Sequence, residues 1–264
     1  MDREKLLSFH NWFKQYVGEF YTDDANIQPA IIFKEKHTHR VCQNIVRIGK
    51  SLGLNDADLF LAEAIALFHD VGRFRQYTQY RTFSDRKSEN HALLGLRELE
   101  RAKVLNCLDA GEQDLIKKAI EYHCVCDLPP DIGERHLLFS RLVRDADKLD
   151  ILSVVAGYYS GRNREENPLL ESGLPDSEGY SPVLIDNLLH GRGCSYSDIR
   201  NLNDRKLLML SWVYDINFPY TLSEVTEKGF IAKIVESLPP TGDIRSVYKH
   251  LQEYIALRQS RGTK

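Results

Sequence analysis

Imidazole and carboxylate side chains recur at long intervals along the chain, each at the end or on the face of an apolar helical pattern. Such spacing excludes a local metal-binding loop and suits ligands that successive helices deliver to a common centre. Neutral imidazoles together with carboxylates favour divalent zinc, iron or manganese. Because a carboxylate can bridge two ions and a neutral ring cannot, Asp70 is the candidate bridge. The candidate ligands are His37, His69, Asp70, His91, His123 and Asp147.

Helical periodicity must position these residues. An apolar series predicts one helix that starts near His37 and ends before a C-cap glycine, Gly53. The next predicted helix carries His69 and Asp70 in its last turn and ends at Gly72. The pattern therefore places three candidate ligands on two neighbouring helices.

Three further helices carry the remaining candidates. His91 opens one helix, His123 ends another, and Asp147 lies on the apolar face of a third. The polar and aromatic segment 73–90 has no clear period, so we interpret it as a long loop of functional importance. Strand signals are limited to short ambiguous runs such as 30–33, and the chain is predicted to be all-α.

Three short motifs contain four of the candidates. They are His37-Thr38-His39-Arg40-Val41, Leu67-Phe68-His69-Asp70-Val71-Gly72-Arg73 and Asp145-Ala146-Asp147-Lys148-Leu149-Asp150. In this order they resemble the H…HD…D signature of the HD-domain metal-dependent phosphohydrolases, over about residues 34 to 155. The resemblance implies that one metal ion is held by His37, His69, Asp70 and Asp147. His91 and His123 look like the two extra histidines of family members with two metals, which implies an HD-domain helical bundle with a dinuclear site.

The resemblance also implies a mechanism. Two cations lower the pKa of a bound water and stabilise charge on a phosphoryl oxygen, while Asp70 bridges them and holds the nucleophile in place. Arg73 occupies the place where many family members carry a lysine, so it is a candidate catalytic and phosphate-binding residue. Glu63, two helical turns before Asp70, is a candidate proton acceptor on the inner wall. Further candidates for binding the substrate phosphate are Arg81, Lys87, Arg144 and Lys148.

These features predict a hydrolase that acts on a small phosphorylated metabolite, such as a nucleotide or dinucleotide, by attack of a metal-activated water. Tyr77, Tyr80 and Phe83 offer rings that could stack on a nucleobase. The alternatives are a phosphodiesterase of a cyclic nucleotide or dinucleotide, a di-iron HD-type oxygenase, and a ligand sensor without turnover. The sequence does not distinguish Fe, Mn, Zn, Ni, Co and Mg. Cys124 and Cys126 are interpreted as packing residues, because no second cysteine pair completes a zinc site.

Composition excludes several other classes of protein. With 35 basic and 38 acidic residues the net charge of −3 offers no basic excess for a nucleic-acid polymer. No apolar run approaches the roughly 20 residues that span a bilayer, so no membrane partner is expected. The first residues lack a secretory signal and the five cysteines are an odd number, which favours the cytoplasm. A homo-oligomer remains compatible with the sequence.

The chain of 264 residues is predicted to form a single HD-type domain. Its metal-binding core is expected over about residues 30–155, followed by a loop-rich insertion or lid over 156–200. The helices expected within 201–264 would complete the core. Tyr158, Tyr159 and Arg162 would face the cleft from the start of the insertion.

Overall fold

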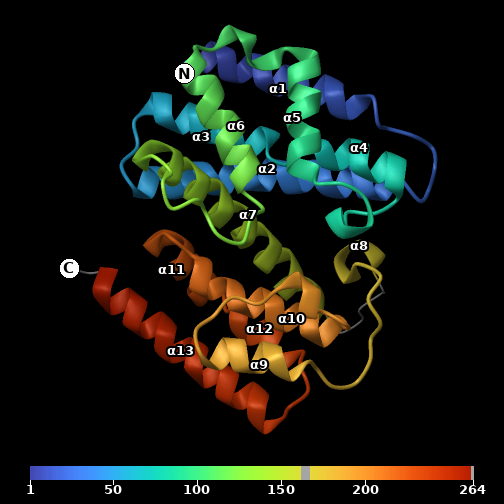
Figure 1. Cartoon of the computed structure of the whole chain (residues 1–264), viewed down its shortest axis with the longest axis vertical. Helices are drawn as coiled ribbons and strands as arrows, with labels where there is room; N and C mark the ends of the chain where they lie inside the picture. Colours follow the sequence, from blue (N-terminus) through green and yellow to red (C-terminus); the bar gives the residue numbers. More distant parts are fainter. Residues whose placement is uncertain (162–166, 263–264) are drawn as a thin grey trace. The chain divides into compact units, whose positions relative to one another are not determined.

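The computed structural model describes residues 1–161 and 167–262, and all regular elements in these two ranges are helices (Figure 1). They contain no strand, so the predicted all-α fold is confirmed. The described chain divides into two compact units, Met1–Asp147 and Lys148–Lys264. A single domain over the whole chain stays a prediction, as does the role of the 156–200 segment as a lid. Arg162, which was expected to face the cleft, lies outside the described residues.

The first unit is a helical bundle in which α2 and α3 lie side by side, α1 and α6 pack on α3, and α4 packs on α5 (Figure 1). Helix α7 starts in this unit and continues into the second. The elements are α1 (Arg3–Gly18), α2 (Gln28–Ser51), α3 (Asp56–Phe68), α4 (Val71–Tyr80), η1 (Asp85–Lys87), α5 (His91–Ala102), η2 (Val104–Cys107), α6 (Ala110–Tyr122) and α7 (Glu134–Ser160).

Apolar side chains from α1 to α4 form the core of the first unit. Phe9 of α1 packs its ring against Phe68 at the end of α3, with centroids 5.1 Å apart. Phe13 packs edge-on against Phe74 of α4 at 5.8 Å. The predicted apolar series of α2 contributes Val41, Ile45 and Ile48, all fully buried. Burial of each large side chain stabilises this arrangement by about 1.5–3 kcal/mol, and it fixes the helices that carry the candidate ligands.

The segment after Asp70 is helical, so our prediction of a long loop from residue 73 is wrong. The chain leaves α3 at Phe68, turns at Asp70 with φ −111° and ψ 15°, and enters α4 at once. The period of α4 is hidden in the sequence because its buried face includes a fully buried glutamine, Gln76. This side chain hydrogen-bonds to residues of the shorter true loop, 81–90.

Gly72 does not end a helix, as its position in the sequence suggested, but permits close packing of two helices. A Cβ at this position would lie 2.1 Å from the carbonyl oxygen of His91 and 2.6 Å from the amide nitrogen of Gly95. No side chain larger than hydrogen fits at such distances. The glycine thus brings α4 against the first turn of α5, where His91 lies.

The second unit buries its own apolar cluster, which includes Leu152, Leu188, Leu210 and Val247. Helices α11 and α12 are separate, because Gly229 adopts a left-handed φ of +66° between them. The elements are α8 (Pro168–Glu171), α9 (Pro182–Leu189), η3 (Tyr196–Asp198), α10 (Leu202–Ser211), η4 (Trp212–Asp215), α11 (Pro219–Glu227), α12 (Phe230–Glu236) and α13 (Gly242–Gly262).

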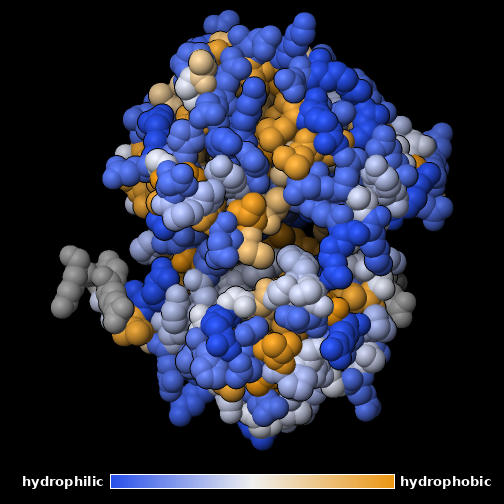
Figure 2. Space-filling view, viewed as in Figure 1, coloured by the Kyte–Doolittle hydropathy of each residue, from blue (hydrophilic) through white to orange (hydrophobic). Residues whose placement is uncertain are grey.

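Hydrophilic residues cover most of the visible surface of both units, with smaller apolar groups among them (Figure 2). Within the described ranges, no helix has both the length and the apolar content needed to cross a bilayer.

Candidate metal centre

All six predicted metal ligands meet in the first unit, around the carboxylate of Asp70. Helix α2 supplies His37, and the turn after α3 supplies His69 and Asp70. His91 is the first residue of α5, which Asn90 caps by accepting a hydrogen bond from the amide of Leu93. His123 follows the last residue of α6, and Asp147 lies in α7. The predicted convergence of five helices on one centre is therefore present.

One oxygen of Asp70 faces the first set of ligands. The Oδ2 atom of Asp70 lies 3.5 Å from His37 Nε2 and 3.6 Å from His69 Nε2. Asp147 joins this set, since its Oδ1 lies 3.1 Å from His37 Nε2 and 3.9 Å from His69 Nε2. Two imidazole nitrogens and two carboxylate oxygens thus surround one small volume.

The other oxygen of Asp70 faces a second set. Its Oδ1 atom lies 3.4 Å from His91 Nε2 and 3.9 Å from His123 Nε2. The two Nε2 atoms are 2.9 Å from each other. The carboxylate thus stands between two pairs of imidazoles and directs one oxygen at each.

Hydrogen bonds on the outer side of three rings determine which nitrogen carries the proton. The Nδ1 atoms of His69 and His123 each lie 2.7 Å from a backbone carbonyl oxygen, and His91 Nδ1 lies 2.6 Å from the carboxylate of Asp85. Carbonyl and ionised carboxylate oxygens only accept, so in each neutral ring Nδ1 holds the proton. The three Nε2 atoms therefore present lone pairs to the centre.

These lone pairs fit a metal ion. Within the described residues nothing hydrogen-bonds to the buried Nε2 of His69. The Nε2 lone pairs of His91 and His123 face each other at 2.9 Å, and a cation between them, a proton or a metal ion, removes their repulsion. The donor set of imidazole nitrogen and carboxylate oxygen suits a divalent transition metal.

Burial keeps the imidazoles in the neutral form that binds metals. It lowers the pKa of His69 and of His91, and it lowers the pKa of His123 to about 3. Burial alone would raise the pKa of Asp70, but Lys34, His69, His37 and Arg73 together outweigh it and hold the pKa well below its usual range. The centre thus combines neutral rings with an ionised carboxylate near neutral pH.

The family model of the HD domain matches residues 35–152. Over this range, which is somewhat under half of its length, the chain is similar to the HD domain family. The matched range contains all six predicted ligands, and the resemblance found in the sequence is confirmed. The match, together with the clusters of histidine and aspartate, indicates a metal-dependent hydrolase. Comparison with curated proteins and with solved structures gave no match.

Lys34 is a residue beside this centre that the sequence analysis missed. Its Nζ donates to Oδ2 of Asp70 at 2.5 Å, and its side chain is mostly buried. Lys34 precedes His37 by one turn of α2, and residues three apart on a helix share a face. This three-residue spacing from His37 was the sequence signal that could have identified Lys34.

Asp85 is a second missed residue. One of its oxygens, Oδ2, accepts the hydrogen bond from His91 Nδ1, while Oδ1 accepts from Arg73 Nη1 at 2.8 Å and Gln76 Nε2 at 2.9 Å. The pKa of Asp85 lies below its usual value because these partners outweigh its burial. Carboxylates of this kind orient a ligating histidine. The sequence offered no comparable signal, since Asp85 starts the three-residue helix η1, which is too short to show a periodic pattern.

Arg73 lies beside the centre, and its predicted catalytic and phosphate-binding role stays a prediction. Its Nε is 3.4 Å from Oδ1 of Asp70. Its Nη1 donates to the carbonyl of Phe83 and to Asp85, so the same side chain ties the 81–90 loop to α4. Arg73 therefore places positive charge next to Asp70, while its Nη1 atom holds the 81–90 loop by hydrogen bonds.

The other predicted phosphate-binding cations have partners elsewhere or lie exposed. Arg81 pairs with Asp24 at 3.3 Å, and Lys87 is exposed in η1. Lys148 belongs to the second unit, where it pairs with Asp215 at 2.5 Å. The phosphate-binding role of Arg81, Lys87 and Lys148 stays a prediction.

Arg144 is buried and bonds to the backbone, which corrects its predicted role as a free phosphate-binding cation. Its guanidinium donates to the carbonyl oxygens of Tyr122 at 3.2 Å, Val125 at 2.5 Å and Cys126 at 3.2 Å. A cation that satisfies three carbonyls in the interior stabilises the turn that contains them. Arg144 thereby holds the turn after α6 against α7.

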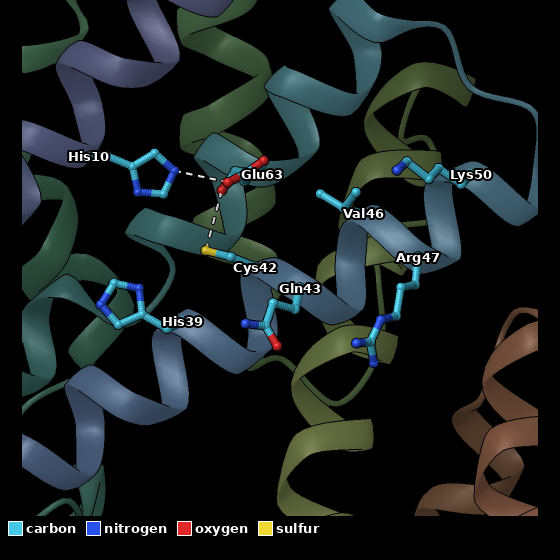
Figure 3. Close-up of a pocket in the computed structure, with 8 residues that line it drawn as sticks. All are labelled: His10, His39, Cys42, Gln43, Val46, Arg47, Lys50 and Glu63. Atoms are coloured by element: carbon cyan, nitrogen blue, oxygen red, sulfur yellow. Dashed lines mark hydrogen bonds and ion pairs between the residues drawn. The ribbon is translucent and has the colours of Figure 1, made fainter.

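Glu63 lies in a different pocket, which corrects its predicted place on the inner wall. Its Oε1 is 2.9 Å from His10 Nε2, and this pair lines a pocket with Cys42 and with exposed residues of α2 (Figure 3). None of the six predicted ligands lines this pocket. The projection from Glu63 to Asp70 failed because α3 ends at Phe68, so the two residues share no continuous helix.

Proposed function

We propose that this HD domain is a phosphohydrolase that binds two divalent cations and acts on a small phosphorylated metabolite, a nucleotide or dinucleotide. The observation that carries the proposal is the division of Asp70 between two ligand sets, with Oδ2 facing His37 and His69 and Oδ1 facing His91 and His123. A carboxylate in this position can bridge two ions, and two ions a few ångströms apart are typical of phosphate-ester hydrolases.

The residues divide into two sets of ligands. His37, His69, Asp147 and Oδ2 of Asp70 would hold the first ion, and His91, His123 and Oδ1 of Asp70 would hold the second. When bound, the ions would supply a hydroxide near neutral pH and stabilise charge on the phosphoryl oxygens. Asp70 orients both sets, and Asp85 fixes the ring of His91.

Two cationic side chains favour an anionic substrate. Lys34 and Arg73 both lie against Asp70, at 2.5 Å and 3.4 Å. Their charges neutralise the carboxylate in the ion-free protein and are free to bind phosphate oxygens once metal ions take over this task. The rings of Tyr77 and Phe83 are 4.6 Å apart, and Lys34 Nζ is 5.5 Å from the Phe83 ring. Aromatic surface beside a phosphate-binding cation supports a nucleotide as substrate.

Metal analysis of purified variants tests the proposal. We expect the wild-type protein to bind two divalent ions, and His69→Ala and His123→Ala to lose at least one each. His136→Ala is the matched control, because His136 pairs with Asp114 outside the centre at 2.9 Å. Unchanged metal content in all three variants would refute the proposed ligand sets.

A substrate screen with the metal-loaded protein tests the reaction. We expect release of phosphate from nucleotides, and loss of this activity in Asp70→Asn. Nitrophenyl phosphate compared with bis-nitrophenyl phosphate separates a monoesterase from the alternative phosphodiesterase. Oxygen consumption by the iron-loaded protein in place of hydrolysis would replace the proposal with the alternative di-iron oxygenase.

A further inference from the structure

Cys124 lies next to the second set of ligands. One ligand atom each of His91, His123 and Cys124 lie within 4.8 Å of one another. The two histidines are buried, whereas Cys124 is exposed. Cys124 as a residue therefore borders solvent, whereas the other two residues of the group come from the interior.

The turn that carries Cys124 is held in place on both sides. His123 Nδ1 bonds to the carbonyl oxygen of Ile120, in the last turn of α6. After Cys124, the buried guanidinium of Arg144 binds the carbonyls of Val125 and Cys126. These bonds fix the backbone around Cys124, so the position of the thiol beside the two rings follows from the fold.

We propose that Cys124 is a ligand of the second metal ion, together with His91, His123 and Oδ1 of Asp70. The proposal rests on the proposed function, because it requires that the second ion binds. Zinc ligands sit at about 2.0–2.3 Å from the ion, so neighbouring ligand atoms are about 3.3–3.6 Å apart. A separation within 4.8 Å is closed by a small rotation of an exposed side chain. On binding, the S–H bond breaks, the proton passes to solvent, and a sulfur lone pair forms the bond to the metal, with no change of oxidation state.

A thiolate ligand makes the two metal positions chemically different. The first set offers only nitrogen and oxygen atoms. The second set adds a soft sulfur, which favours zinc, iron or cobalt over magnesium or manganese. The thiol thereby selects the metal at the second position, and magnesium alone is expected to fill it poorly.

Cobalt(II) substitution tests this inference. We expect the wild-type protein with two bound cobalt ions to show a thiolate-to-cobalt charge-transfer band in the near ultraviolet. The band should disappear in Cys124→Ser and Cys124→Ala, whose affinity for the second cobalt should fall about tenfold. Cys126→Ala is the matched control, because Cys126 is also exposed and lies two residues away, but does not belong to the group with His91 and His123. It should keep the band.

The outcomes separate this inference from the proposed function. Two bound cobalt ions without the band, or a band that persists in Cys124→Ser, would overturn the cysteine ligand and leave the dinuclear site intact. Loss of the band in Cys126→Ala alone would overturn it equally. A wild-type protein that binds no second cobalt would overturn both. Circular dichroism of each variant checks that the helices form, and the exposed position of Cys124 makes folding of both substitutions expected.

Discussion

Replacing Asp85 by asparagine is expected to weaken the second metal position by reversing the tautomer of His91. In the wild-type protein Oδ1 of Asp85 accepts from Arg73 and Gln76, and Oδ2 accepts from His91 Nδ1. An amide has one oxygen, and the two donors on the Oδ1 side attract it. The amide NH₂ then faces His91 Nδ1, which must become an acceptor.

The consequence of this reversal lies at the centre. If Nδ1 of His91 accepts, its proton moves to Nε2, the atom that lies 3.4 Å from Asp70 and 2.9 Å from His123 Nε2. A protonated Nε2 cannot bind a metal ion. Loss of an outer carboxylate of this kind weakens metal binding about 10–100-fold, which corresponds to about 1.4–2.7 kcal/mol. We therefore expect Asp85→Asn to lower the affinity for one of the two metal ions by this factor and to leave the affinity for the other unchanged.

Competition with a chromogenic chelator resolves the two steps. Asp114→Asn is the matched control, because Asp114 also faces a histidine, His136, at 2.9 Å, but outside the centre. The control should leave both steps unchanged. Equal affinities in Asp85→Asn and wild-type protein would refute the tautomer argument, and weakening of both steps to the same extent would indicate general damage to the centre.

Three further predictions follow from the same contacts. Gly72→Ala should lower the free energy of unfolding by about 3 kcal/mol, because its Cβ would lie 2.1 Å from the His91 carbonyl oxygen. The control Gly157→Ala has no atom within 4 Å of the added Cβ and should raise the free energy of unfolding by up to about 1 kcal/mol. Chemical denaturation of both variants compares the two effects. The free energy of unfolding of the ion-free protein should fall by about 2 kcal/mol between pH 7 and pH 5. Burial lowers the pKa of His123 from 6.5 to about 3. In this pH range the unfolded chain therefore binds a proton at His123 that the folded chain does not bind. Urea titrations at the two pH values measure this loss, and equal stability at both would contradict it. Lys34→Met should raise the KM for a phosphorylated substrate about tenfold without loss of metal, since the Nζ of Lys34 lies at Asp70. The control Lys36→Met, at an exposed neighbouring position, should leave the KM unchanged. Steady-state kinetics together with metal analysis distinguish these results.

The ligands could be predicted from the sequence because each depends on local pattern. His91 follows an N-cap asparagine, and His37 lies one turn before a buried apolar series, so both could be placed on helix faces before the fold was known. The residues around the ligands depend on contacts between distant segments. Asp85 acts through a loop folded by Gln76, and Arg144 bonds to a turn some twenty residues earlier in the chain. No periodicity encodes such contacts.

Cationic residues were the least predictable part of the site, for a physical reason. A long charged side chain can reach any of several partners, and its sequence position does not say which. Arg81 turns to Asp24 and Arg144 to backbone carbonyls, whereas Lys34, which the sequence reasoning passed over, reaches Asp70. Carboxylates and imidazoles with short side chains are confined by their backbone, so their positions follow from the helices.

The four residues His69 to Gly72 show how a break in a helix serves the site. Successive residues of a continuous helix point about 100° apart, so a break between His69 and Val71 turns the Asp70 carboxylate further toward the centre that His69 faces. Asp70 leaves the helical region at ψ 15°, which lets its carboxylate stand between the two ligand sets. Val71 is fully buried and starts α4, and Gly72 lets α5 approach so that His91 reaches Oδ1 of Asp70. A substitution at Gly72 should therefore disturb the second ligand set more than the first, although glycine itself binds nothing.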